Sequence, residues 1–252
     1  MRCVLCVAVF CSLAAAPVVA EETSLTASVG VESRYVIRGY QLAAASVQSS
    51  ATLRIGGFYA GFWHNLPLER DIAPALYNLE ELDLAVGFGA TIAPRLSLEL
   101  GATYYAYPDI AHGYFDIFKE DQGGAGANSA ETFVTLALEA PLSPKLYLFR
   151  DFMYDTFTLQ AGLSQAFSVG GPFGIELSGA AGYVVDDVPS PDYVYGSAAA
   201  NLTLGLADGA TAFAGVRFGG STFAGGLIHD GAVAGTTKPA ATWFGAGLSA
   251  TF

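Results

Sequence analysis

The sequence has 252 residues, of which 52% are hydrophobic and 13% are charged, so it can bury a sizeable core and is not a disordered chain. Eleven basic side chains against 23 acidic ones give a formal net charge of −12 at pH 7, which argues against nucleic acid as a partner.

The first twenty residues have the composition of a secretory signal peptide. Arg2 is the charged head, residues 4–16 form the apolar middle, and residues 18–20 form a small-residue cleavage site. We therefore expect residues 21–252 to form the exported domain. All three cysteines lie in the segment that is removed, so we expect no disulfide, no thiolate metal site and no cofactor.

Beyond residue 20, apolar residues recur at every second position in segments of roughly ten residues, a period typical of strands rather than helices. Short turns and longer loops connect these segments alternately, as in barrels whose turns are periplasmic and whose loops are external. The longest loops span 65–78, 108–130 and 220–240. The predicted strands are 25–38, 46–55, 58–64, 79–91, 96–107, 131–140, 146–150, 157–167, 173–185, 193–206, 211–219 and 241–252.

An open sheet of this size with one apolar face needs a covering layer, but no amphipathic helix long enough to supply one is predicted. The sequence therefore predicts an all-β fold: a closed, antiparallel transmembrane β-barrel of about 12 strands in the bacterial outer membrane. Phe252 is expected to face lipid on a last strand that pairs with the first. A terminal Phe of this kind also resembles the signal that the outer-membrane assembly machinery recognises. The alternative is a secreted β-sandwich that ends in Phe.

If the apolar face is outward, the charged residues of the opposite parity face the lumen, which must then be wet or fully ion-paired. One interpretation is a pore in which a basic patch of Arg34, Arg38 and Arg217 faces Glu81 and Asp83 and sets charge preference. The other is that salt bridges fill the barrel and hold its shape. The predicted lumen residues are Glu32, Arg34, Arg38, Arg54, Glu81, Asp83, Glu99, Glu139, Glu176 and Arg217.

Aromatic residues gather near the ends of the predicted strands. A girdle at the membrane interfaces is the simpler interpretation, because amphipathic rings favour that position. A sugar-binding aromatic track inside the lumen is the alternative. The residues concerned are Phe58, Tyr59, Phe62, Trp63, Tyr104, Tyr105, Tyr107, Tyr193 and Tyr195.

Four segments carry a family resemblance: "SRYVIRG" at 33–39, "GFYAGFW" at 57–63, "ELDLAVGFG" at 81–89 and "LGATYYAYPD" at 100–109. Together they resemble the TorF-like porin family of bacterial outer-membrane β-barrels. The agreement covers roughly residues 25–185. The resemblance implies the barrel fold and brings no catalytic residues with it.

We expect a passive, porin-like channel for small hydrophilic solutes, with outer-membrane lipids and the assembly machinery as its other partners. The alternatives are a plugged structural or ligand-binding barrel and, less favoured, an outer-membrane hydrolase. A hydrolase could draw only on His64, His112 and His229, and neither Gly-x-Ser-x-Gly nor HExxH occurs. The acids of loop 108–130 (Asp116, Glu120 and Asp121) lack calcium-loop spacing, so no metal site is expected.

Overall fold

The computed structural model describes residues 22–69, 78–109, 111, 113–115, 128–186, 192–207, 209–223, 228–229 and 237–252. The predicted signal peptide lies outside the described residues. In the described part of the chain, no helix is long and apolar enough to cross a membrane.

Twelve antiparallel strands close into one barrel, which confirms the predicted fold class. Two further pairs of short strands, β2–β3 and β14–β15, lie apart from the wall. The wall strands are β1 (Thr23–Glu32), β4 (Ser46–Ile55), β5 (Phe58–Pro67), β6 (Glu81–Ala93), β7 (Leu96–Ala106), β8 (Ser129–Leu138), β9 (Lys145–Asp151), β10 (Thr156–Gly170), β11 (Phe173–Asp186), β12 (Tyr193–Ala207), β13 (Ala210–Ser221) and β16 (Ala240–Thr251). The short strands are β2 (Tyr35–Ile37), β3 (Tyr40–Ala43), β14 (Ile228–His229) and β15 (Thr237–Lys238).

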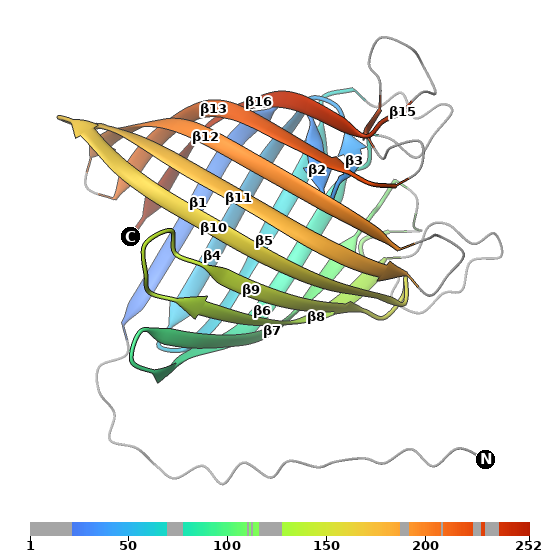
Figure 1. Ribbon diagram of the computed structural model, residues 1–252, viewed down its shortest axis with the longest axis horizontal. Coiled ribbons are helices and arrows are strands. Elements are labelled where there is room, and N and C mark those ends of the chain that lie inside the picture. The colour runs from blue at the N-terminus through green and yellow to red at the C-terminus, as the bar shows by residue number, and fades with distance from the viewer. Residues whose placement is uncertain are drawn as a thin grey trace, which may run out of the picture.

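The barrel closes between its first and last strands, because β1 pairs with β4 on one side and with β16 on the other (Figure 1). The last residue takes part in this closure. The backbone N–H of Leu25 donates to Phe252 O at 3.1 Å, and that of Phe252 donates to Leu25 O at 2.9 Å. The predicted pairing of the terminal strand with the first strand is confirmed.

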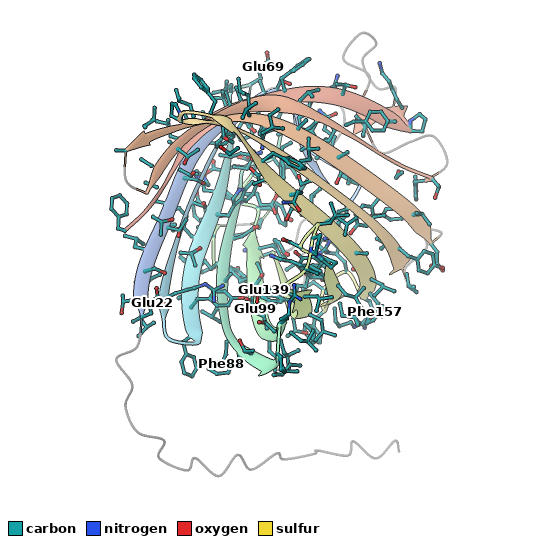
Figure 2. All side chains as sticks on the ribbon, turned by 60° about the vertical axis from the view of Figure 1, so that its left-hand side comes forward. Glu22, Glu69, Phe88, Glu99, Glu139 and Phe157 are labelled. Carbon is teal, nitrogen blue, oxygen red and sulfur yellow. The ribbon has the colours of Figure 1, made fainter. Side chains whose placement is uncertain are left out.

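The outer face of the wall is apolar, as the alternation predicted. Directly paired residues share a face, so the register Leu25↔Leu53 and Phe58↔Phe88 builds continuous apolar rows across neighbouring strands. Phe88 and Phe157 point away from the barrel, whereas Glu99 lies on its inner side (Figure 2). Large apolar side chains remain exposed on every wall strand, among them Val29, Leu53, Phe62, Val86, Leu100, Val134, Leu148, Leu163, Leu177, Leu202, Phe218 and Phe244. An apolar surface of this extent is unfavourable in water, whereas it is the surface that a barrel presents to the hydrocarbon of a bilayer.

The first predicted strand, 25–38, is wrong in its second half. Strand β1 ends at Glu32, and the chain then turns into the barrel as the β2–β3 hairpin. Arg38 and Gly39 form its two-residue turn with φ values of 48° and 77°, and two positive φ values match the tight hairpin turn that suits strand twist. β2 and β3 lie within the ring of wall strands, toward the end opposite the C-terminus (Figure 1). We call residues 35–43 the lumen hairpin.

Candidate functional site in the barrel lumen

The lumen hairpin is fixed to the wall along its second strand. The backbone N–H of Leu79, just before β6, donates to Leu42 O at 3.0 Å, and the side chain of Asn78 accepts the backbone N–H of Ala44 at 2.8 Å. Gln41 and Ala43 are fully buried. The hairpin is therefore a packed element of the outer half of the lumen.

The turn of the hairpin approaches β12 and β13 of the wall closely. A Cβ atom on Gly39 would lie 2.8 Å from Cβ of Ser221 on β13 and 2.9 Å from Cβ of Tyr195 on β12. Such distances are well below van der Waals contact, and the φ of 77° is unfavourable for other residues. Gly39 is thus required both by the turn and by its close approach to the wall.

Arg38 is held by a bidentate ion pair to Glu131 on β8. Its two terminal nitrogens donate to the two carboxylate oxygens at 2.7 and 2.9 Å. The guanidinium lies 4.3 Å from the ring centre of Phe149, and Tyr105 donates a further hydrogen bond to Glu131 at 2.9 Å. Burial alone would lower the pKa of Arg38, but the hydrogen bonds and the charge of Glu131 raise it above its usual value. The pair ties the tip of the hairpin to the wall.

A buried acidic cluster lies beside this pair. Glu81 and Asp83 lie on the same face of β6, and Tyr107 donates to Glu81 at 3.2 Å. Tyr35 of the hairpin lies near this cluster and packs its ring 4.9 Å from that of Trp63. Burial, together with the nearby carboxylates, raises the pKa of Tyr35 and of Tyr107 well above the ordinary value.

The other two members of the predicted basic patch, Arg217 and Arg34, have partners elsewhere in the lumen. Arg217 on β13 pairs with Glu32 on β1 at 3.0 Å and donates to Asn201 on β12 at 2.6 Å. Arg34 follows the end of β1 and donates to Gln41 of the hairpin at 2.8 Å. The predicted basic residues are thus distributed over three sets of partners instead of facing Glu81 and Asp83 as one patch.

The inner half of the lumen holds a wetter pair. Arg54 on β4 lies 3.3 Å from Glu99 on β7, and Tyr59 donates to the same carboxylate at 2.8 Å. These strands are not neighbours, so the pair crosses the concave inner face of β5 and β6. Glu176 is exposed on the inner face of β11, opposite Asn201, and Glu139 follows β8 in a short turn and is exposed.

The aromatic residues do not all form a girdle. Phe58 and Phe62 face outward, but Tyr59 and Trp63 contact lumen side chains. Tyr105 reaches Glu131, and Tyr195 donates inward to Gln160 at 2.6 Å. Strand alternation places adjacent aromatics on opposite faces, so the girdle interpretation is wrong for the second member of each such pair.

Cavities run along the wall past the hairpin. An outer cavity of about 360 Å³ is bounded by Arg38 and Tyr105, and a cavity of about 230 Å³ shares Tyr105 with it and extends to Tyr59. A third, of about 440 Å³, contains Glu99, the partner of Tyr59. It shares Lys145 with a fourth cavity of about 310 Å³. Polar side chains thus border a series of spaces from the outer mouth to the inner half.

His64, the one histidine whose side chain lies in the described region, sits on the lipid-facing side of the rim. Its Nε2 atom is 3.1 Å from Glu80, which also accepts a hydrogen bond from Tyr114 at 2.5 Å. His112 and the acids at 116, 120 and 121 lie outside the described residues, as does the side chain of His229. Within the described ranges, no three His, Cys, Asp or Glu side chains converge on a possible metal position.

Sequence reasoning missed Glu131 as the partner of Arg38. Its parity with Phe133 and Thr135 on β8 could have placed it in the lumen. The Arg-Gly dipeptide between two short alternating runs could have indicated the hairpin turn. The pairing itself spans 93 positions and depends on the closed wall.

A closed barrel with an apolar exterior and a polar, ion-paired interior defines an outer-membrane β-barrel protein. Residues 16–200 match the family described as "Bacterial protein of unknown function (Gcw_chp)". The chain therefore belongs to this family, and its membrane is the bacterial outer membrane. The comparison with curated proteins found no match.

A solved outer-membrane porin has a similar fold. The NanC porin is similar at 10% identity, with 90% of this chain and 98% of that chain covered and a TM-score of 0.52. LpxR from Salmonella typhimurium has 9% identity, coverage of 91% and 100%, and a TM-score of 0.49. An anion-selective porin from Comamonas acidovorans has 18% identity, coverage of 81% and 59%, and a TM-score of 0.37. At 10% identity, the likeness to the NanC porin is one of fold alone.

Proposed function

We propose that this porin-like barrel is a passive channel for small hydrophilic solutes, narrowed in its outer half by the lumen hairpin. The observation that carries the proposal is the series of polar-bordered cavities that passes the hairpin through Tyr105, Tyr59 and Glu99. A dry, purely structural interior would not need partly exposed ionic groups such as Arg54 and Glu99.

Charge preference is assigned to the ionic groups of the lumen: Glu32, Arg34, Arg38, Arg54, Glu81, Asp83, Glu99, Glu176 and Arg217. Most of these are engaged in pairs or hydrogen bonds. Among the described residues, no ion pair joins Glu176 to a cation, so its exposed carboxylate should favour cations. Glu176→Gln should lower the cation-to-anion permeability ratio measured from reversal potentials in a salt gradient.

Planar-bilayer recording of the refolded protein tests the channel. The informative variant replaces residues 33–45 by Asn-Gly, which joins Glu32 to Ser46, already a register pair, through a turn suited to hairpins. We expect small discrete conductance steps from the parent and larger steps from this variant. Gly171→Ala, in a short turn with open space around it, is the control and should conduct like the parent.

The rival function is a plugged, ligand-binding or structural barrel, and the bidentate Arg38–Glu131 pair favours it. The same recordings separate the two. Conductance from the shortened variant alone would identify a plug and reject the passive channel. Silence from both, with heat-modifiable mobility showing a folded barrel, would also reject it.

The proposal gives the barrel no catalytic role. His64 faces the lipid side, and its side chain contacts Glu80, which supports a structural role for His64 at the rim. If refolded protein cleaves phospholipid or peptide substrates, and His64→Ala abolishes that cleavage, the hydrolase alternative replaces the channel.

A further inference from the structure

Above the lumen hairpin, the outer cavity of about 360 Å³ opens at the end of the barrel that carries the long loops. This volume lies within the range of about 300–1,000 Å³ that is typical of small-molecule sites. Tyrosines dominate its lining, joined by aliphatic side chains of the hairpin and the wall. The tyrosines are Tyr40, Tyr105, Tyr107, Tyr154 and Tyr193.

Hydrogen bonds from their hydroxyl groups to buried carboxylates orient two of the tyrosine rings. Tyr105 donates its hydroxyl to Glu131 at 2.9 Å, and Tyr107 donates to Glu81 at 3.2 Å. Both carboxylates are buried deeper in the lumen, at 1% and 0% exposure. Because these hydroxyls are already hydrogen-bonded to the two carboxylates, the rings offer the cavity mainly their carbon surfaces.

The ionic groups that border the cavity, Arg38 and Asp151, already have ion-pair or hydrogen-bond partners. Arg38 is neutralised by Glu131 through two hydrogen bonds. Asp151 accepts hydrogen bonds from the hydroxyl of Ser129 at 2.5 Å and from the backbone N–H groups of Met153 and Tyr154, each at 2.9 Å. A charged ligand would lose hydration here and would find both ionic groups already engaged with protein partners.

A ligand for this cavity must arrive from water, carry no net charge and present an apolar ring face. We propose that the tyrosine-lined outer cavity binds a neutral sugar, whose C–H face stacks on the rings while its hydroxyls face Thr156 and the open mouth. Binding at this site does not require an open channel, because the cavity can be occupied in a conducting or a plugged barrel.

Equilibrium binding of maltose to the full refolded chain in detergent tests the site, by isothermal titration calorimetry with saturation-transfer NMR as a second readout. We expect saturable binding that Tyr154→Ala weakens by at least about fivefold, through lost ring stacking. Tyr154→Phe keeps the ring and should bind like the parent. Tyr183→Ala is the matched control, because Tyr183 is equally exposed at 43% but faces outward from β11.

The assignment is overturned by any of three results: no saturable maltose binding, equal loss in the Tyr154 and Tyr183 alanine variants, or tighter binding of the charged relatives gluconate and glucosamine. Saturable binding of phenol without binding of maltose would also overturn it, since a plain aromatic ligand would then fit the cavity. Failure of the channel proposal is distinguishable, because a conductance-silent barrel can still bind maltose.

Discussion

Removal of the Arg38 side-chain charge is expected to release the lumen hairpin. Arg38→Met keeps much of the aliphatic volume but leaves Glu131, which is 1% exposed, without its cation. Breaking a buried ion pair by removing one partner costs about 3–5 kcal/mol. Tyr105 still donates one hydrogen bond to Glu131, and the outer cavity adjoins the pair, so we expect the lower end, about 3 kcal/mol.

The two partners should respond unequally. Glu131→Gln leaves Arg38 without its carboxylate, but the Arg38 side chain is 20% exposed and can recover some hydration. Glu131→Gln should therefore lower the free energy of unfolding by less than Arg38→Met does. The double variant removes both charges and should recover about 1–2 kcal/mol relative to Arg38→Met alone. This recovery is the signature of a specific pair, as opposed to general damage to the lumen.

Reversible urea unfolding in lipid vesicles, followed by the fluorescence of Trp63 and Trp243, measures these differences. Single-channel recording supplies an independent readout, because a released hairpin should raise the conductance of Arg38→Met. The reasoning is refuted if Arg38→Met and the double variant both unfold within about 0.5 kcal/mol of the parent, the range ordinary for surface substitutions.

Further outcomes follow from the turn, the terminus and the buried tyrosines. Gly39→Ala should destabilise the barrel by roughly 2–3 kcal/mol in urea unfolding and raise its conductance. Gly171→Ala is the control, because Gly171 has a similar positive φ but no atom within 4 Å, and it should cost only about 1 kcal/mol. Equal losses of stability in the two variants would contradict the close contact of Gly39 with the wall. Phe252→Ala should lower the amount of heat-modifiable barrel in the outer-membrane fraction but leave refolding in detergent intact, because the backbone bonds to β1 remain; unchanged assembly in cells would reject Phe252 as a recognition signal. The contribution of the buried tyrosines to the free energy of unfolding should be constant below about pH 10 and fall above it. Burial raises the pKa of Tyr107 well above its ordinary value and that of Tyr154 to about 12, so the unfolded chain releases these protons first. A flat profile from pH 9 to 12 would contradict these buried tyrosines, and Tyr154→Phe should remove its own share of the slope.

The wall of the barrel was predictable because its information is local. Apolar residues at every second position indicate which face of a strand is apolar, and turn residues indicate where each strand ends. The predicted strands 46–55 and 173–185 therefore agree with β4 and β11 to within one residue. Closure followed from the need to pair the edges of an apolar sheet, and it placed Phe252 beside Leu25.

The lumen was not predictable in the same way. Residues 33–38 continue the alternation of β1, and period alone does not separate a longer wall strand from a hairpin that turns inward. Which carboxylate Arg38 meets depends on how far the hairpin crosses the lumen and which strand lies opposite after closure. The sequence by itself determined the number of wall strands, their apolar face and most of the lumen-facing acids and bases. Only the tertiary structure decided which of these charges pair across the interior beside the tyrosine-lined cavity, because those contacts join strands that are neighbours neither in sequence nor in the sheet.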